Sequence, residues 1–246
     1  MGGQGELADQ QQAAAGIGQG AVHPALGVRE DPVAEQALGH PLHLGVAVAG
    51  FDPDQRQPPG ADPGVGGVVR EGEGASFSAG PDLHWMRGMA AASEDENRED
   101  ALALARLMRT LDELPRPTIA RVHGPAFGGG VGLVACCDIA IGAPAARFGL
   151  TESRLGLLPA VISPFVIDAI GARQARRWFA TAETFDAAMA LQLGLLHQVV
   201  DADALDGAVA TQAALLCRTA PRATAVAKVV VREGAGRDGA PPRDRA

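Results

Sequence analysis

The chain has 246 residues, with 21 basic against 29 acidic side chains and a net charge of −8 at pH 7. This balance argues against broad nucleic-acid binding and against a basic membrane-binding patch. Aromatic residues make up only 4% of the chain and Tyr is absent, so a core has to be built from small and aliphatic side chains.

The three cysteines do not form a disulfide framework, because two of them, Cys136 and Cys137, are adjacent. We interpret them as buried small residues in a reducing compartment. The N-terminus lacks a basic segment followed by an apolar run, and no stretch approaches the roughly 18 apolar residues of a membrane span. These features predict a cytosolic protein that does not contact a membrane.

Residues 1–67 differ in composition from the rest of the chain. Gly and Pro make up about a third of them, and bulky hydrophobic residues are few. Within this region 44–51 is predicted to be a short strand, and 55–67 has the composition of a linker. Because such a composition buries little apolar surface against its ordering entropy, we predict poor order for most of the region.

Strands alternate with helices over residues 68–233, which indicates an α/β domain. Ser93 and Glu96 form a capping-box pattern that predicts a helix ending near Leu114, before Pro115. Strands are predicted at 118–122, 139–142 and 195–200. Helices are predicted at 129–137, 163–170, 172–180, 185–193, 203–218 and from Pro221 onward, followed by a frayed tail at 234–246.

A glycine-rich stretch lies at the centre of this domain. The loop from His123 leads through Gly128, Gly129 and Gly130 into small apolar residues that suit a tightly packed helix. Glycines let a ligand approach the backbone, and the first N–H groups of a helix point outward at the positive end of its dipole. Such a junction can hold a phosphate or an oxyanion formed during a reaction, although a glycine hinge is an equal alternative from this stretch alone.

Several segments together resemble the crotonase family of enoyl-CoA hydratases and isomerases. Their sequences are most similar to those of the methylglutaconyl-CoA hydratase type. The segments are 77–83 (Phe-Ser-Ala-Gly-Pro-Asp-Leu), 123–130, 137–139, 148–156, and 194–200 after a helix that begins at 185. The resemblance covers about residues 68–233. It implies a spiral of ββα turns, a homotrimer or hexamer, and a coenzyme A thioester as substrate, with no separate cofactor.

The resemblance also implies which residues form the site. Gly129 corresponds to one of two backbone donors to the thioester oxygen, and Pro81 occupies the position of the other. Because proline has no N–H, half of this oxyanion hole is missing if the register holds. Losing one donor typically costs about 10²–10³-fold in rate. The substrate-binding residues implied by the motifs are Ala79, Gly80, Pro81, Asp82, Leu83, Gly128, Gly132 and Lys228.

Glu152 is the predicted catalytic acid/base. Family hydratases commonly use two glutamates, and the second position is here Gly132, which cannot ionise. A carboxyl group buried beside an apolar acyl pocket has a raised pKa, which suits proton transfer near neutral pH. The alternative is an exposed loop carboxylate or a partner of Arg154.

Other polar residues are assigned lesser roles. We interpret His123 as a structural turn residue and Asp138 as the anchor of a strand, whereas His84 and Trp85 flank the acyl pocket or pack in the core. Lys228 resembles a family lysine near the CoA phosphates, with a solvated helix face as the alternative.

Three functions remain open at this point: hydration of an enoyl-CoA, isomerisation by a single glutamate, or an impaired CoA-binding relic. The composition of both ends motivates a further hypothesis, that they are out of frame or truncated relative to a functional relative. Resequencing the coding DNA tests that hypothesis.

Overall fold

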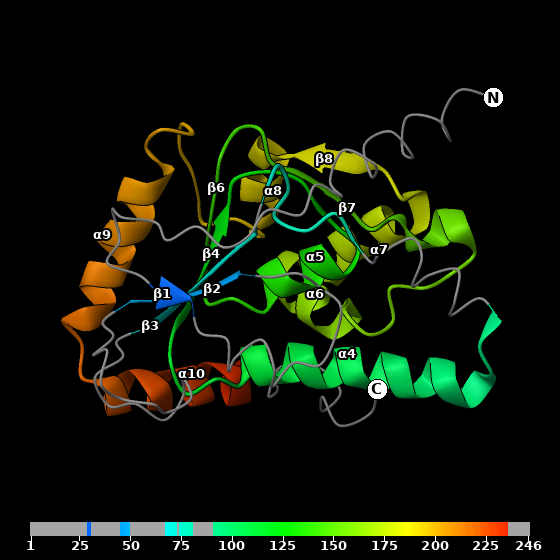
Figure 1. The fold of residues 1–246 in the computed structure, drawn as a ribbon, viewed down its shortest axis with the longest axis horizontal. Coiled ribbons are helices and arrows are strands. Elements are labelled where there is room, and N and C mark those ends of the chain that lie inside the picture. Colours follow the sequence, from blue (N-terminus) through cyan, green and yellow to red (C-terminus); the bar gives the residue numbers. More distant parts are fainter. Residues whose placement is uncertain (1–28, 31–44, 50–66, 73, 81–90, 236–246) are drawn as a thin grey trace.

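The computed structural model describes residues 29–30, 45–49, 67–72, 74–80 and 91–235. They form two β-sheets with helices packed around them (Figure 1). The larger sheet has the order β1 (Arg29–Glu30), β2 (Gly45–Ala49), β3 (Gly67–Glu71), β4 (Thr118–Val122), β6 (Ile139–Gly142) and β9 (Gln198–Val199). The smaller sheet has the order β5 (Ala126–Phe127), β7 (Arg147–Gly149) and β8 (Thr184–Asp186).

The pairing of neighbouring strands in the larger sheet changes from antiparallel to parallel at β3. Strands β1, β2 and β3 pair antiparallel, whereas β3, β4, β6 and β9 pair parallel. Val69 of β3 pairs with Ile119, which in turn pairs with Ile139, so the three central strands start at the same level. Parallel neighbours require a crossover connection, and the helices between these strands supply it.

A ββα unit repeats along this part of the chain. The first strand of each unit joins the larger sheet and the second joins the smaller sheet, as β4 and β5 do before the next helix, and as β6 and β7 do in turn. After β3, Ser78 forms a parallel bridge with Ala126 of β5. β3 of the larger sheet is thus also followed by a segment that pairs with the smaller sheet. This arrangement confirms the predicted α/β fold with a spiral of ββα turns.

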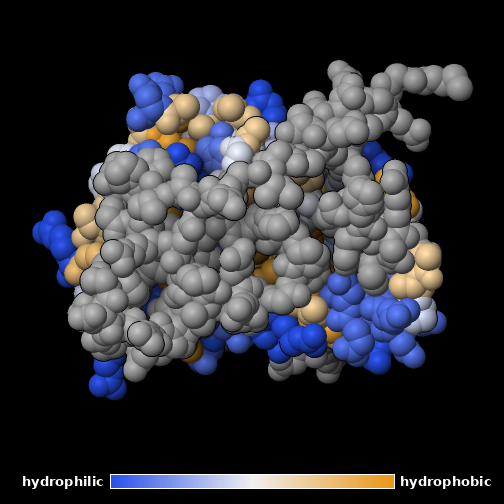
Figure 2. Space-filling view, viewed as in Figure 1, coloured by the Kyte–Doolittle hydropathy of each residue, from blue (hydrophilic) through white to orange (hydrophobic). Residues whose placement is uncertain are grey.

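Seven α-helices are described: α4 (Glu94–Asp112), α5 (Gly129–Ala135), α6 (Ser163–Ile170), α7 (Ala172–Thr181), α8 (Ala187–Leu193), α9 (Leu205–Cys217) and α10 (Pro221–Ala235). Helix α4 begins with the predicted capping box, in which Ser93 Oγ accepts from the Glu96 N–H and the Glu96 carboxylate accepts from the Ser93 N–H. Hydrophilic side chains cover its outer face (Figure 2). None of the helices within the described ranges is both long and apolar enough to span a membrane.

Two predicted elements differ from the structure. The segment predicted as a helix at 185–193 begins as strand β8, because Phe185 pairs with Phe148 of β7 and the two rings stack at 5.6 Å between centroids. Asp186 then caps α8 by accepting from the Met189 N–H at 2.8 Å. The strand predicted at 195–200 is reduced to β9, which spans only two residues.

The core lies on both faces of the larger sheet. On one face, Val69, Ile119 and Ile141 pack against Leu205 and Val209 of α9. The opposite face joins the main hydrophobic cluster, which extends through α4, α5, α6 and α7 to the smaller sheet. Burial on both faces is typical of parallel strands.

The cysteines divide between the core and the surface. Cys136 and Cys137 are buried, as predicted, whereas Cys217 is exposed at the end of α9, so that part of the prediction is wrong. Residues 1–28, 31–44 and 50–66 lie outside the described residues, as does most of the predicted tail. The predicted strand at 44–51 is present as β2.

Candidate active site

The glycine-rich stretch forms a strand, a tight turn and a helix. β5 ends at Phe127, and Gly128 follows with φ 52° and ψ −120°, a backbone conformation that side chains disfavour. The Gly128 N–H donates to the Gly149 carbonyl of β7 at 2.9 Å, and α5 begins at the next residue. The turn is therefore held by the neighbouring strand and is not a free hinge.

The first sequence motif packs directly against this turn. The Ser78 N–H donates to the Pro125 carbonyl at 3.1 Å, and the Phe127 N–H donates to the Ser78 carbonyl at 3.0 Å. A Cβ atom on Gly130 would lie 2.7 Å from Ser78 Cβ, so only glycine fits there. Gly80, which has φ 94°, follows Ala79 beside Phe127. Two motifs almost fifty residues apart thus meet at the start of α5.

Several predicted site residues fall outside the described residues. They are Pro81, Asp82 and Leu83 of the first motif, together with His84 and Trp85. The prediction that Pro81 removes one oxyanion donor rests on the sequence and stays a prediction.

Gly129 has free space at the position of a Cβ atom. A Cβ atom at this residue would meet nothing within 4 Å, in contrast to its crowded neighbour Gly130. Among the described residues, none accepts a hydrogen bond from the Gly129 N–H, as expected for the first residue of a helix. This N–H is available to an acceptor that carries negative charge.

The Glu152 carboxyl group lies beside the same turn. Glu152 belongs to a short 3₁₀-helix, η1 (Thr151–Leu155), that follows β7, and its Oε1 lies 3.2 Å from the position of a Cβ on Gly128. Oε2 is buried and has no hydrogen-bond partner among the described residues. Burial raises the pKa of Glu152 above its ordinary value, chiefly by desolvation. The alternative in which Glu152 pairs with the exposed Arg154 is not what the structure shows.

Gly132 faces the protein interior. A Cβ atom on this residue would lie 2.4 Å from Ile162 Cγ2 and 3.2 Å from Met108 Cε. No side chain fits at this position while Ile162 remains in place, and a glutamate least of all. Sequence reasoning missed Ile162, because it follows Gly132 by thirty residues in a different loop and carries no motif signal.

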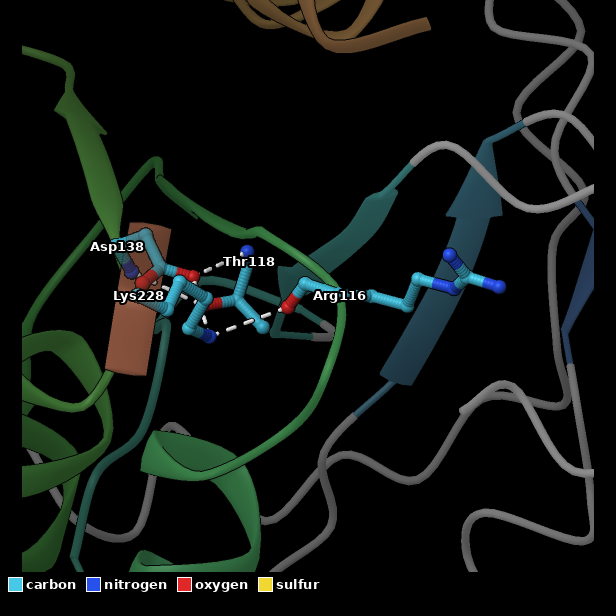
Figure 3. Close-up of polar contacts among 4 residues, drawn as sticks. All are labelled: Arg116, Thr118, Asp138 and Lys228. Atoms are coloured by element: carbon cyan, nitrogen blue, oxygen red, sulfur yellow. Dashed lines mark hydrogen bonds and ion pairs between the residues drawn. The ribbon is translucent and has the colours of Figure 1, made fainter. Parts of the chain in front are cut away.

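Lys228 lies in an ion pair (Figure 3). Its Nζ is 2.7 Å from Asp138 Oδ2 and donates to the Arg116 carbonyl at 3.1 Å. Asp138 also accepts from the backbone N–H and hydroxyl of Thr118, which confirms its predicted role as a strand anchor. The pair lies at the end of α5 opposite to Gly129. Lys228 therefore is not on a solvated helix face, and a contact with CoA phosphates stays a prediction.

His123 has the structural role predicted for it. Its Nε2 is 3.0 Å from the Gly74 carbonyl, and this contact ties the loop before β5 to the loop after β3. Burial lowers the pKa of His123, so the ring is neutral near pH 7. The ring therefore helps to hold the two loops together.

Known proteins share the sequence pattern and the fold of this chain. A family model described as enoyl-CoA hydratase/isomerase matches residues 60–241. A solved structure of an enoyl-CoA hydratase from Shewanella pealeana superposes with a TM-score of 0.70 at 42% identity, and covers 76% of this chain and 69% of that chain.

Curated relatives carry more than one name. A putative enoyl-CoA hydratase of Thermus thermophilus is 37% identical over 139 residues, which is 56% of this chain and 55% of the relative. A 4-chlorobenzoyl coenzyme A dehalogenase of an Arthrobacter species is 35% identical over 141 residues, 56% of this chain and 51% of the relative. The chain thus spans about half the length of these curated relatives.

Proposed function

Because this chain belongs to the enoyl-CoA hydratase/isomerase family, we propose that it adds water across the 2,3 double bond of an enoyl-CoA thioester. The observation that supports this most directly is the Glu152 carboxyl group, which is partly buried, has no partner at Oε2 among the described residues and lies beside Gly128, the residue before Gly129. A proton-transfer group beside a backbone donor is what enolate chemistry needs. The dehalogenase relative is also named for a coenzyme A substrate, so a CoA thioester is the common element.

In the proposed reaction, a water molecule hydrogen-bonded to Glu152 attacks C3 of the enoyl group. The electron pair of the double bond moves toward the thioester oxygen, and the Gly129 N–H stabilises the enolate that forms. A proton reaches C2 from Glu152, and the proton lost by the water restores the carboxyl group. One molecule of water is thereby added and Glu152 is regenerated.

Isomerisation is the second candidate, and the packing at Gly132 favours it. Ile162 fills the space that a second carboxylate on α5 would need, so Glu152 is the one acid/base among the described residues of this site. A single carboxyl group can move a proton between C4 and C2 through the same enolate, with no water consumed.

One assay separates these functions. The purified chain is incubated with 2-enoyl-CoA and 3-enoyl-CoA, and the absorbance of the conjugated enoyl thioester is followed. Hydration removes the signal of the first substrate, whereas isomerisation creates that signal from the second. If the absorbance changes with neither substrate while the chain still binds CoA, the result supports an impaired CoA-binding relic. Such a result would be in line with the proline at position 81.

Replacing Glu152 tests its role. We expect Glu152→Gln to lower turnover by about 10²–10⁴-fold, because the amide cannot exchange a proton. Glu99→Gln is the matched control, since Glu99 is exposed on α4 and its contact with Arg98 is 4.0 Å long. Turnover that is equal in the wild type and in Glu152→Gln would contradict the assignment.

A further inference from the structure

Arginines gather on two elements beside the candidate site. The 3₁₀-helix η1 carries Arg154 two residues after Glu152. Helix α7 packs against η1 and carries Arg173, Arg176 and Arg177. All four arginines are exposed, and Glu152 is the only acidic residue of these two helices. Because the chain as a whole has a net charge of −8, this concentration of positive charge runs against its overall composition.

Most of this charge is not balanced within the protein. Arg177 forms an exposed pair with Glu183, with Nη2 3.0 Å from Oε2, and its guanidinium carbon lies 4.3 Å from the centre of the Trp178 ring. No carboxylate among the described residues pairs with the other three arginines. Arg173 lies in the first turn of α7, where the helix dipole disfavours a cation, and Arg176 follows it on the same face. An anionic partner would relieve both unfavourable interactions.

The chain after Glu152 also exposes large apolar side chains. Leu155, Leu157 and Leu158 are 62%, 54% and 81% exposed. The Leu157 N–H donates to the Glu152 carbonyl at 3.1 Å, so this run is tied to the helix that holds the carboxyl group. Arginine together with exposed apolar residues is typical of protein–protein interfaces, in which an apolar centre lies within a polar rim. We call the following set the arginine–leucine surface: Arg154, Leu155, Leu157, Leu158, Arg173 and Arg176.

Charge complementarity requires an acidic partner for this surface, and its position indicates which kind. The surface begins on the same 3₁₀-helix as Glu152, so a partner seated on it lies beside the candidate site. Acyl thioesters are carried on a phosphopantetheine arm, which occurs both in free coenzyme A and on small acidic carrier proteins. We propose that the arginine–leucine surface docks an acidic acyl carrier protein, which presents its enoyl group to Glu152 as a phosphopantetheine thioester. This inference rests on the proposed function, since it names the form in which the same thioester arrives.

Docking is measured first, by binding without turnover. A fluorescently labelled acidic acyl carrier protein in its apo form, which lacks the phosphopantetheine arm, is titrated with the full chain while its anisotropy is followed. We expect a dissociation constant in the micromolar range. This constant should rise about fivefold or more between about 50 and 500 mM NaCl, because salt screens exposed charges.

Charge reversal on α7 tests which residues bind the carrier. Arg173→Glu/Arg176→Glu should weaken binding about tenfold or more, and it suits the fold, since an acidic residue in the first turn agrees with the helix dipole. Arg106→Glu/Arg109→Glu is the matched control, because it reverses two exposed arginines at the same spacing on α4 and should leave binding unchanged. Circular dichroism checks that each variant keeps the wild-type fold.

Turnover then tests delivery of the acyl group. A 2-butenoyl group is offered on the same carrier protein, now with its arm, and on coenzyme A, and mass spectrometry follows the gain of water. Arg173→Glu/Arg176→Glu should lower kcat/KM for the carrier-borne substrate about tenfold and leave kcat/KM for the coenzyme A substrate within about twofold. Equal losses with both substrates would assign the arginines to coenzyme A binding and overturn the proposal.

The two measurements separate docking from catalysis. A chain that hydrates neither substrate contradicts the proposed function, whereas the binding of the apo carrier still decides the docking. The docking proposal is overturned if the apo carrier does not bind, or if the reversal on α7 leaves its binding unchanged. Tighter binding to a single-stranded RNA or to phosphatidylserine vesicles than to the carrier would also overturn it, because the surface would then serve another class of partner.

Discussion

Glu152 is placed where burial disfavours its charge. Its carboxyl group lies against the Gly128 turn with Oε2 unpartnered, and desolvation raises its pKa. A site that holds an acid in this way reduces the stability of the fold when the acid ionises. The same feature that suits Glu152 to proton transfer therefore has a measurable thermodynamic signature.

We expect this signature in the pH dependence of unfolding. Because the pKa of Glu152 is higher in the folded than in the unfolded chain, its contribution to stability falls as pH rises from its ordinary value through the folded value. Glu152→Gln removes that fall, so its melting temperature should match the wild type at pH 4 and exceed it by about 2–4 °C at pH 8. If the wild type and Glu152→Gln have the same melting temperature at pH 4 and also at pH 8, the carboxyl group is not desolvated.

Arg70 is a second residue whose environment opposes its charge. It lies on β3 and is only 3% exposed, and its Nε and Nη2 have no hydrogen-bond partner among the described residues. Burial lowers the pKa of this guanidinium group. A buried charge without a partner is costly, and an apolar residue of similar volume is better tolerated.

We therefore expect Arg70→Leu to stabilise the fold. The free energy of unfolding should rise by about 1–4 kcal/mol in urea titrations, since the desolvation penalty is removed and apolar packing is gained. Arg176→Leu is the matched control, because Arg176 is exposed on α7 and should change stability by less than about 0.5 kcal/mol. A loss of stability in Arg70→Leu would mean that the guanidinium group has a favourable partner.

At the scale of elements, α5 is positioned by close packing on both sides. Its glycines admit Ser78 on one side and Ile162 on the other, so the helix approaches the first motif and α6 more closely than a helix with side chains there would. This packing fixes the start of the helix, where Gly128 lies beside Glu152. It also makes α5 sensitive to any added atom.

Gly132→Ala tests this packing. The new Cβ would lie 2.4 Å from Ile162 Cγ2, so we expect a loss of about 1–3 kcal/mol in the free energy of unfolding, despite the better helix propensity of alanine. Gly129→Ala, where the Cβ meets open space, should show no such loss. In a double-mutant cycle, Ile162→Ala should reduce the cost of Gly132→Ala. Strictly additive costs would contradict the steric explanation.

Helix α10 contacts the rest of the domain through the ion pair between Lys228 and Asp138. The Lys228 and Asp138 side chains are only 13% and 29% exposed, and Asp138 also fixes Thr118 at the start of β4. We expect Lys228→Met to destabilise the fold by about 1–2 kcal/mol and to speed hydrogen exchange in α10 before other helices. Arg98→Met, which breaks an exposed pair with Glu99, is the control. It should change neither the stability of the fold nor the hydrogen exchange of α10. Unchanged exchange in α10 would show that other contacts hold it.

At the scale of the whole molecule, the candidate site is built where three ββα turns meet. Gly80 follows the bridge at Ser78, Gly129 follows β5, and Glu152 follows β7. Because β5 runs parallel both to β7 and to the segment that bridges at Ser78, the carboxyl ends of these three segments lie at the same edge. The spiral thereby brings together Gly80 and Glu152, which are 72 positions apart in the chain.

Much of the secondary structure could be predicted from local patterns. The capping box at Ser93, the proline stop after α4, and the helices α6 and α10 follow from residues within one or two turns of each other. The helix predicted at 185–193 is confirmed as α8 from Ala187, but its first two residues belong to β8, because Phe185 pairs with Phe148. A partner almost forty residues away decided that element, and no local pattern reports it.

Local patterns in the sequence identify the residues that are available for chemistry: a glycine turn before a helix, one glutamate in the following loop, and motifs in the order of a known family. The contacts that these residues make depend on how distant segments pack. In the folded chain Ile162 packs against Gly132, whereas the Cβ position of Gly129 is unobstructed. Burial desolvates the Glu152 carboxyl group. The Lys228 side chain is largely buried, and the valines of α10 are exposed. The physical reason is that pKa values, steric room and exposure arise from contacts between segments far apart in the chain, which local spacing cannot specify.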